Sequence, residues 1–575
     1  MNDKNKLCKP FAWFKSHLAI LNWLPYYSKN DFLADTIAGF TLGLTVLPQS
    51  MAYAGLGGLK PQFGLYSSFM GSFIYAFFGT IKEVSIGPTS LMAILAVGYT
   101  RDLPVEFMIL LTFLCGCVQF LCGIFKLSFL VDFISLPTVS GFQSATSVTI
   151  IVSQLKYIFG IKFKSSSIAN DLYNLYNQFS ELKVNDTILG IFSIIFLLSL
   201  RKLGNLNISK DKHKLKKSLW LISISRNALV VIICSLLAFF TESNGKFLFT
   251  VTGNVTQGLP AFTVPKFHLS YENHEYSFLD MCKKLDFGII VVSLVAILGN
   301  VAIAKAFASG KIVDSSQEMI TLGMCNIFGS FVQSMPTSGA FTRSAVSNAS
   351  GVRTPLSGIF SGTLVVLALV YLTPYFFYIT KPTLAAVLIS AVIFMIDFNI
   401  LKPLWKTSKL DFFTTVITFI LSLMYGVEIG LLVGTLINIV NLLRLWARPK
   451  INYDIYETDT GRKYIKIVPS IGLFYPAVDY LQTEISKIAL QTDHEDLTIL
   501  IDCRSILSTD YTAVKGIQAI IKDFENRNQK LLFTNINSTV KEIIENLHQV
   551  KNYASTESKI YNLIDENELI SDERD

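Results

Sequence analysis

Residues 335–351, MPTSGAFTRSAVSNASG, form a polar segment with one cation, Arg343, between two strongly apolar runs. Irregular backbone at membrane depth must face protein or water, because peptide groups left unpaired in lipid are very unfavourable. An arginine at that depth needs an anionic or carbonyl partner. These residue types predict a site that binds an anion. The alternative is a structural arginine that ties loop carbonyls together.

Two carboxylates, Glu318 and Glu428, are the other charged groups of interest in apolar runs. Each could couple protons or be hydrogen-bonded structurally. The six histidines lie outside the apolar runs, and Cys115, Cys117 and Cys122 lack His or carboxylate neighbours. The chain has no G-x-S-x-G motif and no P-loop. We therefore expect no enzyme activity, no metal site and no cofactor.

The elements that must position Arg343 are membrane helices. Of the 575 residues, 51% are hydrophobic and 16% are charged, against about 25% charged in soluble domains. Twelve apolar runs are long enough to cross ~30 Å of hydrocarbon, and two short polar-tinged pieces bring the total to fourteen. The runs lie at 32–57, 63–81, 104–124, 138–159, 186–200, 226–241, 286–308, 316–333, 355–373, 383–397, 411–424 and 427–446, and the short pieces at 88–99 and 340–349. Fourteen segments divide into two inverted sets of seven.

Loop charges orient the bundle. Residues 201–218 hold seven Lys and Arg against one acid, whereas residues 241–285 balance four lysines with four acids. By the positive-inside rule the first loop and both termini are cytosolic. Asn254, in an N-V-T sequon of the other loop, is then a glycosylation candidate. The net charge of +7 follows from this asymmetry, so we expect no nucleic-acid partner.

The pattern changes to soluble α/β after residue 447. Strands are predicted at 464–468, 497–503 and 530–535, and helices at 476–490, 511–526 and 540–547, with Ser508, Thr509 and Asp510 as cap candidates. Alternation of this kind predicts a small sheet covered by helices. The expected domains are a cytosolic N-terminal segment with interfacial Trp13 and Trp23 (1–30), a transmembrane domain (31–447), an α/β domain (448–565) and an acidic tail (566–575).

Several long motifs, in order, resemble the SulP, or solute carrier 26, anion transporters. They are LPQSMAYAGLGGLKPQFGLYSSF at 47–69, VSIGPTSLMAIL at 84–95, AIAKAFAS at 302–309, DSSQEMITLGMCNIFGSF at 314–331, SGAFTRSAVSNASGVRTPLSG at 338–358 and, for the STAS domain of that family, ILIDCRSILSTDYTAVKGI at 499–517. The resemblance implies an all-α membrane domain of seven plus seven segments, divided into core and gate, followed by a cytosolic STAS domain. It also implies a homodimer.

The resemblance further implies an anion held between the N-termini of the third and tenth segments. Facing helix starts would aim positive dipole ends and free N–H groups at one point. The implied substrate-binding residues are Gln49, Tyr53, Thr89, Ser90, Thr342 and Arg343. Gln49 could instead satisfy backbone freed by Pro48, Tyr53 could be packing, and the other hydroxyls could be helix caps. GPTS at 87–90 and MPTS at 335–338 share three of four residues. The resemblance places the start of the tenth helix near Phe341, several residues after MPTS, so we expect this similarity to be a coincidence.

Two departures from the family pattern alter the expected mechanism. Members thought to use protons have a glutamate on the eighth segment, where this chain has Leu298-Gly299-Asn300-Val301. We therefore predict exchange or uniport in preference to proton symport. In bacterial STAS relatives a phosphorylatable serine follows the aspartate at the helix start, but here Tyr511 follows Asp510. We interpret the domain as an assembly and interaction module.

The resulting hypothesis is a secondary anion transporter for sulfate, chloride, bicarbonate or oxalate that works by alternating access. The alternatives are an anion channel and a STAS-based membrane scaffold or sensor with little transport, while a purine or pyrimidine permease is a more distant one. Expected partners are small anions, membrane lipids, a second copy of the chain and cytosolic proteins bound through the STAS domain. The plasma membrane is the expected location, with the endolysosomal membrane as an alternative.

Overall fold

The structure is a computed structural model of the whole chain. It describes residues 18–129, 133–163, 168–203, 219, 222–223, 225–242, 247–271, 274–308, 313–458, 461–469, 474–490, 497–506, 509–537 and 553–554. Trp13, Ser508, the predicted helix at 540–547, the acidic tail, most of the basic loop 201–218 and the side chain of Glu428 lie outside this description. The chain divides into two compact units, Met1–Thr435 and Leu436–Asp575.

Fourteen described helices occupy the fourteen predicted segments. The first set is α3 (Lys29–Leu56), α4 (Pro61–Phe78), α5 (Ser90–Thr100), α6 (Val105–Ile124), α8 (Leu136–Ile158), α10 (Val184–Leu203) and α12 (Arg226–Phe240). The second set is α14 (Gly288–Phe307), α15 (Ser315–Ser330), α16 (Phe341–Ala349), α17 (Ser357–Leu367), α18 (Lys381–Val392), α20 (Lys409–Tyr425) and α21 (Val427–Ala447). Six of the described helices are long and apolar enough to cross a membrane by length and composition.

The two short helices, α5 and α16, occupy the third place of each set, and each follows a two-residue strand. Strand β1 (Ile86–Gly87) precedes α5 and β4 (Ser338–Gly339) precedes α16, and the two strands pair antiparallel. Extended backbone inside the bundle is tolerated because the strands satisfy each other's peptide groups. The pairing brings the starts of two helices from opposite halves of the chain to one place.

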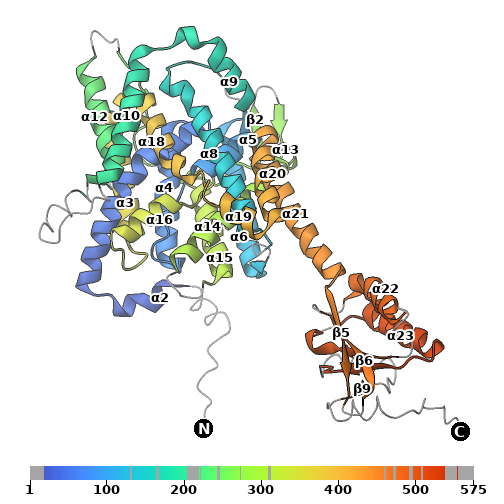
Figure 1. Cartoon of the computed structure of the whole chain (residues 1–575). Helices are drawn as coiled ribbons and strands as arrows, with labels where there is room; N and C mark the ends of the chain where they lie inside the picture. Colours follow the sequence, from blue (N-terminus) through green and yellow to red (C-terminus); the bar gives the residue numbers. More distant parts are fainter. Residues whose placement is uncertain are drawn as a thin grey trace, which may run out of the picture. The chain divides into compact units, whose positions relative to one another are not determined.

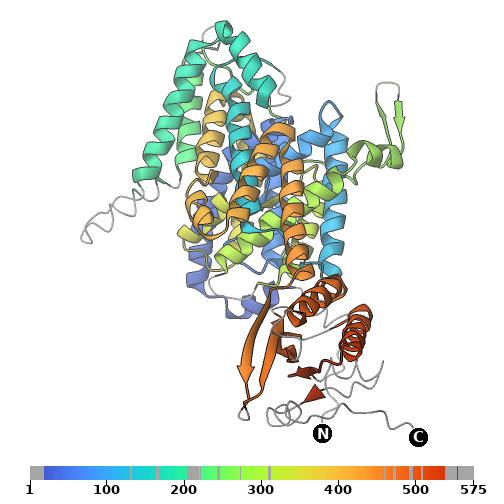
Figure 2. The ribbon, with the colours of Figure 1, turned by 45° about the vertical axis from the view of Figure 1, so that its right-hand side comes forward.

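Figures 1 and 2 show the helix bundle of the membrane unit, and the contacts between its helices define two groups. The first four helices of each set pack on one another, with α15 against α4 and α6, and α17 against α3 and α4. The core of this group is tight where Gly116 of α6 meets Gly323 of α15, because a Cβ on either glycine would lie within 3 Å of backbone atoms of the other helix. The later helices form the second group, in which α8 packs against α18 and α20, and α10 against α12 and α18. These groups correspond to the expected core and gate.

Several elements were not foreseen because they lie between apolar runs. They are α2 (Ile20–Trp23), α9 (Ile168–Asn177), α13 (Phe278–Leu285), α19 (Leu401–Thr407) and a hairpin of β2 (Leu269–Tyr271) and β3 (His274–Tyr276). The helix α13 begins with a capping box, in which Ser277 and Asp280 bond each other's backbone N–H groups. Short polar elements of this kind carry no long hydrophobic period.

The second unit carries a five-stranded sheet in the order β5-β6-β7-β8-β9. Its strands are β5 (Ile451–Glu457), β6 (Lys463–Pro469), β7 (Thr498–Asp502), β8 (Leu531–Thr534) and β9 (Tyr553–Ala554), and its main helices are α22 (Val478–Ala489) and α23 (Tyr511–Asn526). Strands β6 to β9 are parallel. Three predicted strands and two predicted helices are therefore confirmed. Strand β5, antiparallel to β6 and mostly exposed, was not predicted, although Ile451, Tyr453 and Ile455 alternate with polar residues along it.

The start of α23 agrees with the expected cap. Asp510 is the N-cap residue, and its carboxylate accepts a 2.8 Å hydrogen bond from the N–H of Ala513. Its second oxygen accepts a 2.8 Å hydrogen bond from the N–H of Tyr475. The carboxylate therefore both caps α23 and ties it to the segment before α22.

Candidate anion-binding site

Arg343 lies in the first turn of α16, and its side chain is fully buried. Its Nη1 donates a 2.7 Å hydrogen bond to the carbonyl of Pro88, which follows β1. Within the described residues, Nε and Nη2 have no hydrogen-bond partner. Leaving donors of a buried cation unpaired is costly. The guanidinium is thus held at one nitrogen and has two nitrogens available for an acceptor.

Gly87 makes room for this guanidinium. A Cβ built on Gly87 would lie 3.1 Å from Nη2 of Arg343, closer than an ordinary van der Waals contact. The residue stands in β1 opposite Ser338 of β4. The register agrees with a coincidental similarity of GPTS and MPTS. GPTS at 87–90 begins at the last residue of β1, whereas MPTS at 335–338 ends at the first residue of β4, so the two tetrapeptides occupy different positions.

The segment before α16 is fixed by buried hydrogen bonds. Ala340 N–H donates to the carbonyl of Ser85 at 3.1 Å, and Ser85 N–H donates to Oγ of Ser344 at 3.2 Å. Thr337 donates to Oδ1 of Asn326 from its N–H at 2.8 Å and from its hydroxyl at 2.9 Å. The polar segment therefore faces protein, as its position between membrane helices requires.

The starts of α5 and α16 differ in their caps. Thr89 is the N-cap of α5, and its hydroxyl accepts from the N–H of Met92 at 3.3 Å. Ala340 is the N-cap of α16 and offers no side-chain cap. The capping alternative is therefore right for Thr89 and wrong for Ser90 and Thr342, which lie inside the first turns. Uncapped first-turn N–H groups with a positive helix end suit an anion.

Helix α3 packs against both α5 and α16 and carries the remaining predicted residues. Gln49 and Tyr53 are buried and one turn apart, so they share a face of α3. The phenol of Tyr53 lies within electrostatic range of the Arg343 guanidinium. The Oε1 of Gln49 has no partner among the described residues. A backbone carbonyl freed by Pro48 would need the amide NH₂ of Gln49 as its donor, so that alternative stays a prediction.

Glu318, the candidate proton-coupling acid, is a second buried charge. Its carboxylate accepts from the hydroxyl and N–H of Thr80 at 2.5 and 3.1 Å, and from the hydroxyl of Tyr75 at 3.0 Å. The amide of Asn300 donates to it at 3.1 Å. The groups around the carboxylate are donors, which suits its anionic form. On the eighth helix, α14, where some family members have a glutamate, this chain therefore has Asn300 as a hydrogen-bond donor to Glu318.

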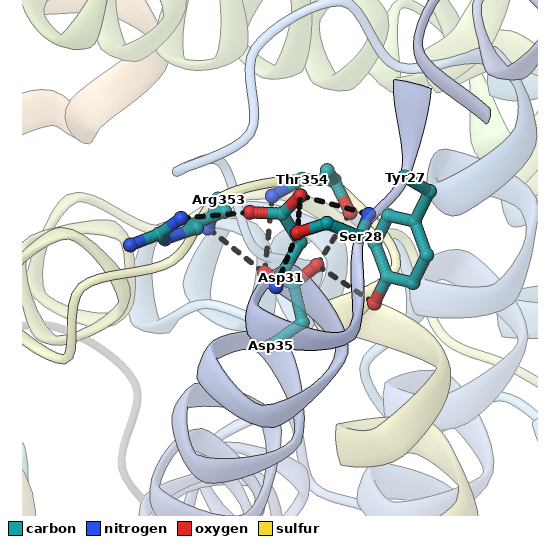
Figure 3. Close-up of polar contacts among 6 residues, drawn as sticks. All are labelled: Tyr27, Ser28, Asp31, Asp35, Arg353 and Thr354. Atoms are coloured by element: carbon teal, nitrogen blue, oxygen red, sulfur yellow. Dashed lines mark hydrogen bonds and ion pairs between the residues drawn. The ribbon is translucent and has the colours of Figure 1, made fainter. Parts of the chain in front are cut away.

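Asp35 is a residue that helps to position α16 and that the sequence reasoning missed. It is buried in α3, and its Oδ1 accepts from the N–H groups of Arg353 and Thr354 at 2.8 and 3.0 Å (Figure 3). Its Oδ2 accepts from the hydroxyls of Thr354 and Tyr27 at 2.6 and 3.2 Å. Asp31, one turn earlier, accepts from Nη1 of Arg353 at 2.9 Å. These contacts tie the loop after α16 to α3, so both ends of the short helix are anchored.

A cavity of about 730 Å³ lies between the two helix groups. The residues that line it include Ile94 of α5 and Thr149 and Ser153 of α8. Ile94 is four residues from the start of α5 at Ser90, which is about one helical turn. The cavity therefore extends from the C-terminal end of α5 to about one turn from its start at Ser90. We call it the vestibule.

Among the described residues no group of three His, Cys, Asp or Glu side chains is placed to hold a metal ion. Asn254 of the predicted sequon is exposed.

Comparisons with known proteins cover nearly the whole chain. The family model of the sulfate permease family matches residues 32–418, and that of the STAS domain matches residues 463–566. The sodium-independent sulfate anion transporter of Bos taurus is 37% identical over 536 residues, which are 92% of this chain and 87% of that protein. The chloroplastic sulfate transporter 4.1 of Arabidopsis thaliana is 30% identical and covers 93% of this chain and 80% of its own length.

A solved structure has the same fold. The murine Solute Carrier 26 family member A9 anion transporter, in the inward-facing state, has a TM-score of 0.83 at 21% sequence identity. The match covers 95% of this chain and 92% of that chain. These three relatives are all named as transporters, which agrees with the expectation of a protein that is not an enzyme. The chain therefore belongs to the sulfate permease family, also called SulP or solute carrier 26, and is a multi-pass membrane transport protein with a C-terminal STAS domain.

Proposed function

We propose that this chain is a secondary anion transporter that moves sulfate, or chloride, bicarbonate or oxalate, by alternating access as an exchanger or uniporter. The observation that carries the proposal is the buried Arg343 guanidinium, which has one carbonyl acceptor and two nitrogens without a partner among the described residues. A ligand oxyanion would supply the missing acceptors. Charge-assisted hydrogen bonds of this kind are the strong ones in proteins.

In this proposal the anion lies between the starts of α5 and α16. Arg343 neutralises it, and the first-turn N–H groups of both helices donate to it. Ser90 and Thr342 offer hydroxyls from inside those turns. Gln49 and Tyr53 face the same region from α3 and offer an amide and a phenol. Thr89 acts by fixing the first turn of α5, because its hydroxyl already serves as the cap.

Exchange or uniport is favoured over proton symport by the surroundings of Glu318. A carboxylate that accepts from Thr80, Tyr75 and Asn300 is stabilised in place by its partners. Releasing or taking up a proton during each transport cycle would require breaking this network. Asn300 itself does not titrate.

Both termini are proposed to be cytosolic, which makes the ends of α3, α5 and α8 outward-facing. The seven cations of residues 201–218 support this orientation. Enzymatic removal of a glycan should shift the native protein on a gel, and Asn254→Gln should abolish the shift. Labelling of an introduced cysteine at position 212 from outside intact cells would contradict this orientation. We further propose a homodimer in the plasma membrane, with the STAS domain available to cytosolic partners.

The decisive experiment is uptake by proteoliposomes of sulfate, chloride, bicarbonate and oxalate, at two pH values and with the voltage clamped at zero. The native protein is compared with Arg343→Ala and with Lys402→Ala, which removes an exposed cation elsewhere. We expect saturable uptake of at least one anion, lost in Arg343→Ala and retained in Lys402→Ala. Steady current without saturation would indicate a channel, and absence of uptake in correctly inserted native protein would indicate a scaffold.

A further inference from the structure

A second cavity, of about 350 Å³, adjoins the vestibule at the last turn of α8 and the start of α18. Its lining includes three lysines, Lys156, Lys162 and Lys381, together with Thr250. We call these four residues and the space between them the lysine pocket. The residues come from the last turn of α8, the segment after it, the loop before β2 and the first position of α18. None of the motifs that indicate the family contains them.

The charges around the lysine pocket are unbalanced. Lys183 reaches Oγ1 of Thr250 with its Nζ at 3.3 Å, so four ammonium groups gather here. Asp186 faces the same threonine, but its two oxygens accept from Thr250 N–H at 2.8 Å and from its hydroxyl at 2.5 Å. Asp171 lies within electrostatic range of Lys156. Arg101 lies within the same range of Lys156. Five cations therefore face two carboxylates, and the region is net positive.

The backbone adds to this positive charge. Helix α18 begins at Lys381, and its N-cap Thr380 provides no side-chain cap to the helix. A twelve-residue helix carries a partial positive charge at this end. The N–H of Lys381 already donates to the carbonyl of Thr250 at 2.8 Å, and Pro382 has no N–H, so the helix contributes its dipole and not donors. The donors of the cavity are its ammonium groups, which form charge-assisted hydrogen bonds with oxyanions.

Lys156 connects the lysine pocket to the vestibule, because Lys156 and Tyr157 line both cavities. Its Nζ donates to the carbonyl of Phe163 at 3.3 Å and lies 5.1 and 5.5 Å from the ring centres of Tyr157 and Phe163. These contacts hold the ammonium at the junction. From there the vestibule continues along α8 towards the start of α5.

We propose that the lysine pocket is a second anion site, which takes a divalent oxyanion such as sulfate at the outer mouth and supplies it to the vestibule. The inference rests on the proposed function for the identity of the anion and on the proposed orientation for its place on the outer side. A divalent anion compensates more of the excess positive charge than a monovalent one does. A positively lined cleft raises the local concentration of its ligand and speeds its capture, by roughly 10- to 1,000-fold.

The first test measures binding without transport. Equilibrium dialysis with radiolabelled sulfate compares the purified protein, Arg343→Ala, and Arg343→Ala combined with Lys156→Gln, Lys162→Gln and Lys381→Gln. We expect two sites in the native protein, one in Arg343→Ala and none in the combined variant. Because Lys156 is half-buried, the pair Lys162→Gln and Lys381→Gln provides a second variant for the case in which the triple change does not fold. That pair should weaken the second site by about tenfold.

The second test measures transport from the outer side. The lysine variants should raise the KM for sulfate by about tenfold, more than they change turnover at saturating sulfate. They should also flatten the dependence of kcat/KM on ionic strength, because the steering charges are removed. Lys402→Gln removes an equivalent exposed charge and should change neither quantity.

Each outcome decides one proposal. Sulfate binding that persists in the combined variant, or a single site that vanishes with Arg343 alone, would overturn the lysine pocket and leave the proposed function intact. If the lysine substitutions abolish the second sulfate site while Arg343→Ala leaves uptake unaffected, the proposed function is wrong and the lysine pocket is supported. The phosphate of an anionic lipid has similar chemistry. If the native pocket bound phosphatidylserine vesicles but no free sulfate, the proposal would be wrong.

Discussion

Two regions of the core each bury one full charge, and they treat it in opposite ways. Around Glu318, groups from Tyr75, Thr80 and Asn300 all donate to the carboxylate. Around Arg343, one carbonyl accepts, and two guanidinium nitrogens have no partner in the described part of the chain. Both side chains are fully buried. Depth in the bundle therefore does not distinguish a structural charge from a functional one.

The difference lies in how much of each charge the protein itself satisfies. A buried polar group without partners is unfavourable and is retained only where something compensates it. For Glu318 the compensation is internal, so the group should contribute to stability. For Arg343 it is incomplete, so the missing part should come from a ligand. Substitutions at these and related positions test this division.

The largest effect is expected at Arg343. Arg343→Ala should lower kcat/KM for sulfate by about 100-fold or more, because two charge-assisted hydrogen bonds are worth about 3 kcal/mol. The free energy of unfolding should stay constant or rise, since an incompletely paired buried charge is removed. Uptake and thermal unfolding of the same detergent-solubilised and reconstituted sample measure both quantities. A strongly lowered midpoint with normal uptake would show that Arg343 is the structural charge.

Glu318→Gln should behave in the opposite way. The amide can accept at one oxygen only, and its NH₂ group would face donors, so about 3 kcal/mol of stability should be lost. Thermal unfolding should therefore occur at lower temperature, while KM for sulfate in the surviving protein stays near the native value. A pH dependence of native uptake that disappears in Glu318→Gln would contradict the structural role and indicate proton coupling.

An intermediate effect is expected at Gly87, which leaves space for the guanidinium. Gly87→Ala would bring a Cβ to 3.1 Å from Nη2 and should displace the group by a few tenths of an ångström. We expect KM for sulfate to rise by about tenfold, equivalent to ~1.4 kcal/mol. Gly55→Ala is the matched control, because a Cβ there meets nothing within 4 Å. Equal effects of the two variants would mean that the guanidinium position is unimportant.

The smallest effect extends the comparison to a third buried charge, Asp502 of the STAS domain. Burial opposes its charged form, but hydrogen bonds from Asn535, the Arg504 N–H and Lys466 outweigh burial and lower the pKa of Asp502 below its ordinary value. It is thus a satisfied acid, like Glu318. Asp502→Asn should cost about 1 kcal/mol of local stability at neutral pH and leave anion uptake unchanged.

Hydrogen exchange of peptides containing β7, in the full-length protein, measures this loss. A lowered pKa stabilises the folded state above the unfolded value of about 3.9, and that stability disappears as the pH falls further through the folded value. The difference between Asp502→Asn and native protein should therefore be constant from pH 7 to about 5 and shrink below about pH 4. A difference that grows on acidification would contradict the assignment.

Most of the fold could be predicted because its signals are local. Each membrane helix is encoded by a run of apolar residues within a window of about 20 positions, and the alternation of strands and helices in the STAS domain is similarly local. Short amphipathic elements outside the apolar runs, such as α9 and β5 (Ile451–Glu457), were not predicted because they do not fill such a window.

The site could be predicted only in part. Arg343 stood out because a cation is rare among apolar runs, and the motif resemblance supplied Gln49 and Tyr53. The role of Thr89 as a cap was among the alternatives considered, whereas Asp35 and Gly87 were missed. Asp35 gave no signal because carboxylates near helix starts are common. Gly87 gave none because the need for a glycine there follows only from the nearby Arg343 guanidinium.

The sequence by itself determined the membrane topology expected of this chain, the place of its two short helices and the identity of its unusual charge. Tertiary structure decided what each charge contacts. The carbonyl that holds Arg343 is 255 residues away, and the phenol that bonds Glu318 is 243 residues away. The lysine pocket likewise joins Lys156, Thr250 and Lys381 from three parts of the chain. Apolar runs encode burial locally, but the partners of a buried charge come from distant segments, and only the fold brings them together.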